Sequence, residues 1–320
     1  MFLSTTGGHL AELDSLARRI PPDGDAVWVT HANEQSISML AGRDVEFVPY
    51  VGVRNVVDVL HCLPSAHRLW RRGITRAVST GSGIALGYLP YLAARGVACH
   101  YVESAARVDG PSLTGRVLER VPRVHTYTQY THWAGRRWRY GGSDFDCYEP
   151  VSSGRPLGDV IRVVVTVGTA AEFAFRRLIV GLSGLLARGG PLQQATGLPV
   201  EVLWQTGGTP AADLPISPTP FLPAADLQAA LARADIVVSH AGMGSAIAAL
   251  QAGRLPLLAA RRRREGEAGD DHQRELAAEL ARRGLALHRD PGAITVDDLL
   301  ATVGTSIHTS TAPPPFQLCS

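Results

Sequence analysis

The segment from residue 236 to residue 273 constrains the fold most, because strand-forming and helix-forming stretches alternate along it. The apolar run Ile236–Ser239 has the composition of a buried strand, and His240–Ser245 is a glycine-rich turn. Ala246–Ala252 is typical of a helix, and Leu255–Ala260 is typical of a second strand. A strand, a helix and another strand in succession predict two parallel strands of one sheet.

The glycine turn is also a candidate binding site. Gly242 and Gly244 allow the backbone to bend and to come close to a ligand. A helix that begins near Ser245 points unpaired N–H groups toward the turn, and its dipole favours an anion there by roughly 0.3–1 kcal/mol. We expect a cradle for a diphosphate; the alternative is an ordinary strand-to-helix turn, since many such turns contain glycine.

The same alternation runs through the whole chain in two series, and a length of 320 residues suits two domains. In the second series the β-branched run Val160–Val167 suits the centre of a parallel sheet. Parallel sheets with helices on both faces are therefore expected. The predicted divisions are an N-terminal domain at 1–140, a linker at 141–159, a C-terminal domain at 160–305 and a flexible tail at 306–320 that contains Pro313, Pro314 and Pro315.

Composition excludes several classes of protein. A formal net charge of +2 gives no reason to expect a nucleic-acid partner, and no apolar stretch is long enough to cross a bilayer. No signal peptide is recognised, and the four scattered cysteines (Cys62, Cys99, Cys147 and Cys319) predict reduced thiols in the cytoplasm. Asp144-Phe145-Asp146 matches a metal-binding Asp-x-Asp pattern, but we expect no metal there because no third ligand is near in the sequence.

Several motifs resemble family 28 glycosyltransferases, a group that includes MurG and the two-subunit N-acetylglucosaminyltransferase of the dolichol pathway. The order His-x-Gly-x-Gly-Ser, helix, Gly-Arg-x-Pro, strand, loop and Asp-Asp-His-Gln over residues 240–273 is similar to the donor half of that family. Ser-x-x-Gly-Gly-His at 4–9 and Glu-Ser…Arg…Ser-Leu-Thr-Gly at 103–115 are similar to its acceptor side. The resemblance implies the GT-B fold, an α/β fold in which two Rossmann-like domains face each other across a cleft, with the two dolichol-pathway subunits joined in one chain.

The resemblance also implies two sets of binding residues and no cofactor or metal ion. The set expected to hold a nucleotide-sugar donor comprises Gly168, Thr169, Phe221, His240, Gly242, Gly244, Ser245, Asp271, His272 and Gln273. The set expected on the side of a lipid-linked or glycan acceptor comprises Gly7, Gly8, Gly81, Ser82 and Arg107. Structural alternatives stay open: a helix N-cap for Asp271, a core side chain for Phe221 and a solvated surface arginine for Arg107.

Two residues are candidates for the base that deprotonates the acceptor. His9 titrates near neutrality and lies on the corner after the first strand. Glu103 follows the carboxyl end of another strand, where ligands bind in open α/β sheets. The alternatives are a hydrogen-bonded structural histidine and a carboxylate that caps a helix or pairs with a cation.

Two features leave the function open. Ala248 stands where the family usually has an acidic residue for the ribose hydroxyls, and the run Arg261–Arg264 suits donor phosphates, anionic lipid headgroups or a solvated loop.

We expect an inverting, metal-independent transferase that moves a hexose or N-acetylhexosamine, from a UDP-sugar, in polysaccharide or cell-envelope synthesis. It would lie in the cytoplasm, with peripheral contact at the inner face of the cell membrane. The alternatives are an epimerase, for which Glu103, Glu172 and Asp271 are the available acids, and a non-catalytic partner of another transferase, which Ala248 favours.

Overall fold

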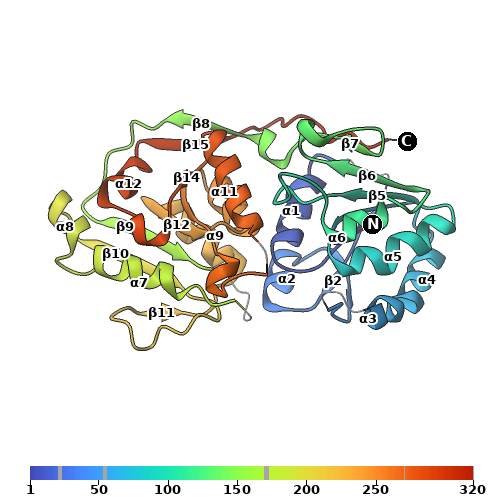
Figure 1. Ribbon diagram of the computed structural model, residues 1–320, viewed down its shortest axis with the longest axis horizontal. Coiled ribbons are helices and arrows are strands. Elements are labelled where there is room, and N and C mark those ends of the chain that lie inside the picture. Colours follow the sequence, from blue (N-terminus) through green and yellow to red (C-terminus); the bar gives the residue numbers. More distant parts are fainter. Residues whose placement is uncertain (21–23, 53–55, 169–172, 270, 320) are drawn as a thin grey trace. The chain divides into compact units, whose positions relative to one another are not determined.

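The chain forms two compact units, each described by itself (Figure 1). The computed structural model describes residues 1–20, 24–52, 56–168, 173–269 and 271–319. One unit comprises Met1–Asp146 together with Ala312–Ser320, and the other comprises Cys147–Thr311. The first passage between units therefore falls inside the predicted linker.

Unit 1 is built on a parallel sheet. Within the described residues its strand order is β3-β2-β1-β4-β5-β6-β7. The strands are β1 (Phe2–Ser4), β2 (Val27–His31), β3 (Asp44–Val48), β4 (Arg76–Gly81), β5 (Ala98–Val102), β6 (Val124–Thr128) and β7 (Trp138–Tyr140). Strand order reverses beside β1, because β2 lies on one side of it and β4 on the other.

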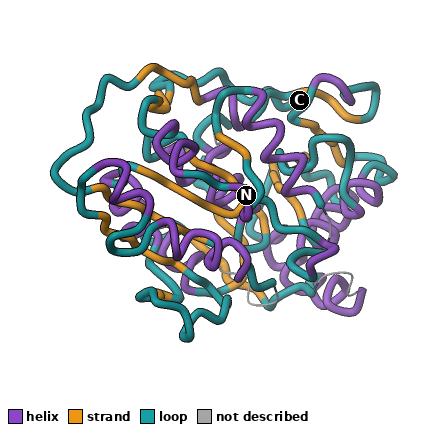
Figure 2. The backbone as a smooth tube through the Cα atoms, turned by 60° about the vertical axis from the view of Figure 1, so that its left-hand side comes forward, coloured by secondary structure: helices purple, strands orange, loops and turns teal. Residues whose placement is uncertain are grey.

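Helices cover both faces of this sheet (Figure 2). They are α1 (Gly8–Ala17), α2 (Glu34–Met39), α3 (Val56–His61), α4 (Leu63–Arg71), α5 (Gly83–Ala94) and α6 (Leu113–Leu118), with short 3-10 turns at Thr131–Trp133 and Asp144–Cys147. Successive strand residues point to opposite faces, so Phe2 packs with Leu10 and Leu13 of α1, whereas Leu3 packs with the α5 side chains. Two apolar layers thus sandwich the sheet.

Unit 2 repeats the plan. Its parallel sheet has the order β11-β10-β9-β12-β13-β14 in the described part of the chain, and the order reverses beside β9. The strands are β9 (Ile161–Thr166), β10 (Val200–Gln205), β11 (Pro218–Thr219), β12 (Ile236–His240), β13 (Pro256–Ala259) and β14 (Leu287–His288). The helices are α7 (Arg176–Leu185), α8 (Pro191–Thr196), α9 (Ala224–Arg233), α10 (Met243–Gln251), α11 (His272–Arg282) and α12 (Val296–Ala301), with 3-10 turns at Arg263–Glu265 and Pro291–Ala293.

The β-branched stretch expected at the centre of a sheet is β9. Ile161, Val163 and Val165 face α7, whereas Val164 faces α9 and α10, and these side chains are at most 3% exposed. The prediction of two Rossmann-like sheets is confirmed.

The flexible tail predicted from residue 306 is wrong for the described residues. Strand β15 (Thr305–Thr309) pairs antiparallel with β8 (Tyr148–Ser152), inside the predicted linker. Beyond it, Phe316 returns to the core of unit 1, is 3% exposed and packs on Tyr127 with ring centroids 6.0 Å apart. Backbone bonds from Phe316 N to Arg19 O and from Gln317 N to Gly141 O hold the segment. Tertiary contacts therefore override its proline-rich composition.

Candidate active site

In unit 2, two glycine turns close around one imidazole. Strands β9 and β12 are neighbours, and the turns at Gly168 and Gly242 follow their carboxyl ends. His240, the final residue of β12, is 9% exposed and fills the space between them. A Cβ at Gly168 would lie 2.6 Å from His240 Cε1, and a Cβ at Gly242 would also collide with the ring. Gly168 has φ +76°, so both the space and the backbone require glycine there.

The chemistry of His240 is that of a neutral hydrogen-bonding group. Burial, together with the nearby Arg261 guanidinium, lowers the pKa of His240 to about 3. Its Nδ1 lies 3.3 Å from Ser245 Oγ, so the imidazole contacts the first turn of α10. The expectation that it positions groups and does not act as a base remains a prediction that this geometry favours.

The amino-terminal end of α10 is suited to an anion. Gly242 is its N-cap, Gly244 and Ser245 lie in its first turn, and that turn carries no acidic side chain. The helix has nine residues, and its first N–H groups have no partner inside the helix. Thr169 lies outside the described residues.

The four consecutive arginines after β13 are not equivalent. Arg261 is 4% exposed, whereas Arg263 and Arg264 are exposed. Arg262 pairs with Asp290, and Arg264 Nε lies 3.1 Å from Glu265. The solvated-loop interpretation therefore fits the later arginines but not Arg261, and the sequence carries no signal that separates them.

The Asp-Asp-His-Gln motif opens α11. Asp271 is its N-cap residue and accepts a 3.2 Å bond from Arg263 N; Gln273 is 6% exposed and accepts a 3.0 Å bond from Arg261 N. His272 is close enough to His240 to contribute to its lowered pKa. The motif therefore adjoins the two glycine turns, and Gln273 holds the backbone of Arg261.

Two further donor-side positions lie outside this cluster. Phe221 is partly exposed in the loop between β11 and α9, so it is not a core side chain. Ala248 lies in α10 and packs against a buried apolar cluster that includes Val164 and Leu231. An apolar contact therefore occupies the position where an acidic residue was expected.

Unit 1 has a similar corner at its own point of strand reversal. His9 lies in the first turn of α1 and not in a loop, and its Nδ1 is 2.9 Å from Thr80 O. Thr80 Oγ1 donates in turn to His9 O at 2.8 Å. A carbonyl only accepts, so the proton of the neutral ring is on Nδ1 and the lone pair is on Nε2.

Glycine turns shape this corner too. Gly7, with φ +85°, is the N-cap before Gly8, and the Gln35 side chain clamps it by accepting from Gly7 N at 2.7 Å and donating to Gly7 O at 3.3 Å. A Cβ at Gly81, where φ is +123°, would lie 3.4 Å from His9 Cε1. Ser82, the N-cap residue of α5, has φ 69°. Gln35 was not predicted, because its position in the sequence gives no hint of this contact.

Glu103 is organised as a structural carboxyl group. It is 1% exposed, and Ser112, the N-cap residue of α6, donates to Glu103 Oε2 from N at 2.9 Å and from Oγ at 3.0 Å. Tyr101 donates to the other oxygen at 3.1 Å, and burial raises the pKa of Glu103. These contacts favour the capping role over the role of base. Arg107 lies on the same loop, near enough to act on the charge of Glu103.

The Asp-x-Asp motif also has a structural use. Asp144 is fully buried and accepts a 2.5 Å bond from Ser15 Oγ, while Asp146 accepts a 2.7 Å bond from Ser143 N. No cluster of three or more metal-ligating side chains occurs among the residues that the structure describes. In the same residues, no helix is both long and apolar enough to span a bilayer.

Comparison with known proteins agrees with this architecture. The model of the glycosyltransferase family 28 C-terminal domain matches residues 162–312. Among solved structures, the chain is similar to MurG from Acinetobacter baumannii, with TM-score 0.55, 18% identity and coverage of 94% of this chain and 88% of that one. It is similar to the glycosyltransferase SnogD from Streptomyces nogalater, with TM-score 0.56, 17% identity and coverage of 95% and 91%.

A third structural relative has a different name. It is a putative UDP-N-acetylglucosamine 2-epimerase from Listeria monocytogenes, with TM-score 0.54, 12% identity and coverage of 98% of this chain and 91% of that one. No curated protein sequence matches the chain.

Two doubly wound sheets, each with glycine turns where its strand order reverses, together with these likenesses, define a protein of the GT-B glycosyltransferase fold. More narrowly, the match of residues 162–312 to the C-terminal domain model supports a family 28 glycosyltransferase that resembles MurG in fold.

Proposed function

We propose that the chain is an inverting, metal-independent transferase that moves a hexose or N-acetylhexosamine from a UDP-sugar onto a lipid-linked or polysaccharide acceptor. The observation that carries this proposal is the closure of the Gly168 and Gly242 turns around neutral His240, beside the first turn of α10. Ligands of doubly wound sheets bind at such a reversal of strand order. The UDP moiety follows from the family resemblance and remains part of the proposal.

In this proposal unit 2 stabilises the leaving group. When the bond from the sugar to the diphosphate breaks, negative charge grows on the diphosphate oxygens. N–H groups of the α10 first turn and the α10 dipole favour that charge, and no acidic side chain in that turn opposes it. Asp271 and His272 are proposed to contact donor hydroxyls or phosphate, and Phe221 the base.

Unit 1 is proposed to activate the acceptor. The acceptor hydroxyl gives its proton to His9 Nε2, its oxygen forms the new bond to the sugar carbon, and the diphosphate leaves with the electrons of the old bond. The Nδ1 contact with Thr80 O supports this role because it fixes the tautomer. General-base catalysis of this kind is worth about 10²- to 10⁴-fold.

Exposed apolar side chains support peripheral contact with the inner face of the cell membrane, where a lipid-linked acceptor would be found. Leu113 and Val117 of α6 are 58% and 43% exposed, and Leu60 of α3 is 56% exposed. Both helices pack on α5, and the exposed Arg116 suits anionic headgroups. Loss of sedimentation with anionic vesicles after Leu113→Asp would support this contact, and unchanged sedimentation would count against it.

The test of the proposed function is a nucleotide titration followed by a transfer assay. UDP, GDP, TDP and ADP are titrated with and without magnesium, and the melting temperature is recorded. UDP at 100 times its Kd should stabilise the protein by about 2.7 kcal/mol, without magnesium. UDP-sugars are then assayed with His9→Gln beside wild type, and the variant should bind UDP normally but transfer about 10²-fold more slowly or worse. Absence of binding by any nucleotide diphosphate would overturn the proposal.

An epimerase is the second candidate, because a putative epimerase shares the fold. Of the acids available for such chemistry, Glu103 is committed to Ser112 and Tyr101, and Glu172 lies outside the described residues. Asp271 holds the N-cap position of α11 without a side-chain capping bond, and it accepts a bond from Arg263 N. Incubation of UDP-sugars without an acceptor separates the two, since only an epimerase would convert the sugar. If the protein binds UDP but neither transfers nor epimerises the sugar, it would be the non-catalytic partner that Ala248 favours.

A further inference from the structure

The side chain of Arg261 is a buried cation without a matching anion. It is 4% exposed, and within the described part of the chain no carboxylate lies within ion-pair distance of it. Its Nε is buried and has no hydrogen-bond partner in the same residues. Burial of an unpaired charge is unfavourable, so a fold retains one only where something compensates it.

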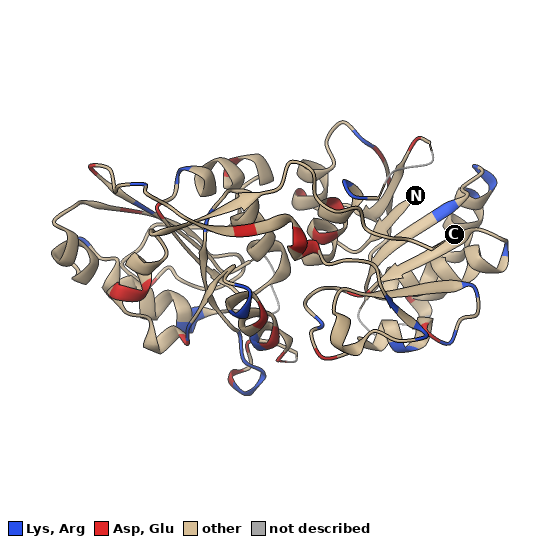
Figure 3. Ribbon diagram, turned by 90° about the horizontal axis from the view of Figure 1, so that it is seen from above, with Lys and Arg blue, Asp and Glu red and all other residues tan. Residues whose placement is uncertain are grey.

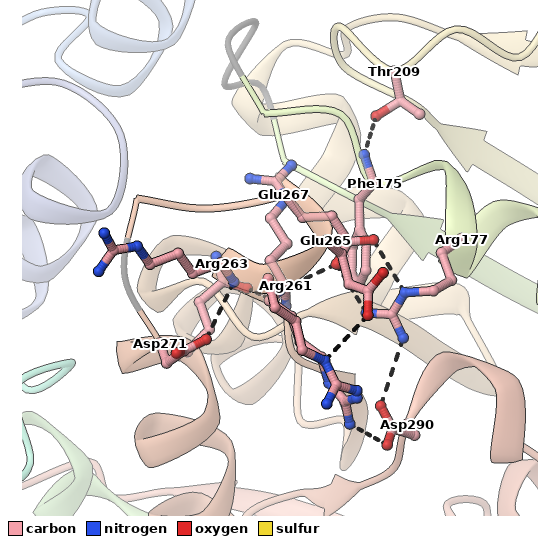
Figure 4. A network of polar contacts seen from close by, with 12 residues as sticks. Phe175, Arg177, Thr209, Arg261, Arg263, Glu265, Glu267, Asp271 and Asp290 are labelled. Carbon is pink, nitrogen blue, oxygen red and sulfur yellow. Dashed lines mark hydrogen bonds and ion pairs between the residues drawn. The ribbon is translucent and has the colours of Figure 1, made fainter.

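The nearest acid does not serve Arg261. Glu267 accepts bonds of 3.1 and 2.8 Å from Arg177 and a 3.1 Å bond from Arg262 N (Figure 4). Its carboxylate is thereby committed to other donors. Burial lowers the pKa of Arg261 to about 10, which still leaves the guanidinium charged at neutral pH. Charged residues are spread over both units (Figure 3), and Arg19 of unit 1 is also buried, but its charge acts on the buried Asp144 carboxyl.

The position of Arg261 connects it to the donor corner. Its backbone follows β13, and its Nη2 donates a 2.5 Å bond to Val167 O, immediately before Gly168. The guanidinium therefore reaches from the end of β13 past β12 to the end of β9. Its charge also acts on His240, which the Gly168 and Gly242 turns enclose.

Neighbouring groups hold both the backbone and the side chain of Arg261 in this place. Gln273 Oε1 accepts from Arg261 N at 3.0 Å, and the Phe175 ring lies 5.7 Å from the guanidinium carbon. These contacts fix the arginine without neutralising it. An anion beside Gly168 and the start of α10 would accept hydrogen bonds from the N–H groups of the α10 first turn. It would also pair with the Arg261 guanidinium.

We propose that Arg261 is a donor-binding residue whose guanidinium pairs with the diphosphate of the nucleotide sugar. The inference rests on the proposed function, which it deepens by naming the cation at the leaving group. It also gives the Gln273 side chain an indirect role, because Gln273 positions Arg261. Guanidinium groups suit phosphate oxygens through paired N–H donors.

The experiment measures the affinities of UDP, inorganic pyrophosphate and uridine by calorimetry for wild type, Arg261→Met and Arg261→Lys. Arg261→Met should weaken binding of UDP and pyrophosphate about 10- to 100-fold and leave uridine binding unchanged. Arg261→Lys should lie between, because it keeps the charge and loses the fork. Arg263→Met is the matched control: it removes an exposed arginine two positions away and should change none of the affinities.

The melting temperature of the ligand-free variants separates binding from structure. An unpaired buried charge does not stabilise the fold, so Arg261→Met should melt no lower than wild type. The inference would be overturned if Arg261→Met weakened UDP and uridine binding equally, or weakened neither. It would also be overturned if this variant had a lower melting temperature and an unchanged ratio of UDP to uridine affinity. If wild type binds neither UDP nor pyrophosphate, the proposed function fails first, and the two failures are distinguishable.

Discussion

The buried carboxyl group of Glu12 should make the stability of this protein depend on pH in an unusual direction. Glu12 lies one turn after His9 on α1 and is fully buried. Its Oε1 accepts bonds of 2.6 Å from Ala105 N and 2.5 Å from Gln129 Nε2, and its Oε2 has no partner among the described residues. Burial, with the nearby Asp144 carboxyl adding to it, raises the pKa of Glu12 from 4.5 to about 8.

The sign and the size follow from proton linkage. Between pH 4.5 and about 8 the unfolded chain releases the proton of Glu12 and the folded protein keeps it. The contribution of Glu12 to stability is therefore complete below pH 4.5 and is lost as the pH rises to about 8. At about 1.4 kcal/mol per pH unit, the loss approaches 5 kcal/mol.

Glu12→Gln tests this account because glutamine keeps the acceptor oxygen and does not titrate. Unfolding in urea is followed by circular dichroism from about pH 3 to pH 9. As the pH rises, the free energy of unfolding of Glu12→Gln should increase by several kcal/mol relative to that of wild type. Glu279→Gln is the control with the opposite sign. Burial alone would raise the pKa of Glu279, but hydrogen bonds from Arg282 and Arg283 lower it. That variant should lose stability near pH 7 and recover relative to wild type below pH 4.5. Parallel curves for Glu12→Gln and wild type would refute the reasoning.

Two further substitutions test the fold and the donor corner. Phe316→Ala removes a ring that is 3% exposed and packs on Tyr127, so it should lower the free energy of unfolding in urea by about 3–5 kcal/mol. The control Gln317→Ala changes an exposed neighbour and should alter that free energy by less than about 0.5 kcal/mol. Equally small effects of the two variants would contradict the packing of this segment. Gly168→Ala and Gly189→Ala both place a Cβ at positive φ, +76° and +70°, at a cost of roughly 1–2 kcal/mol each, but only the first meets His240. Calorimetry should therefore show at least about tenfold weaker UDP binding for Gly168→Ala alone, and similar affinities for the two variants would speak against the corner as a nucleotide site.

Much of the fold could be predicted from the sequence because its determinants are local. The run that became β9 is β-branched except at Arg162, and the segment from β12 to β13 carries its turn and helix signals in order. The composition of 306–320 led to the wrong prediction of a flexible tail, because the contacts that hold this segment are not local. What holds Phe316 is contact with Tyr127 and Gly141, far away in the sequence.

The candidate site could be predicted only in outline. Glycines marked the corners: Gly168 and Gly81 have positive φ, and Gly242 leaves room for the His240 ring. Burial of charged groups could not be foreseen, because charged side chains are mostly exposed. Arg261 could therefore not be told from Arg263, and Glu103 looked as available for catalysis as any acid after a strand.

The return of residues 312–319 to unit 1 has a consequence for synthesis of the protein on the ribosome. Unit 1 is translated first, yet Phe316 belongs to its core. Roughly 170 residues separate Asp146 from Phe316, which corresponds to about 10–30 s of elongation at ~5–20 residues per second. During that time Tyr127, Leu10 and Leu13 lack their contact with Phe316, while the whole sequence of unit 2 is synthesised. The half of the protein that is made first is thus completed after the half that is made second.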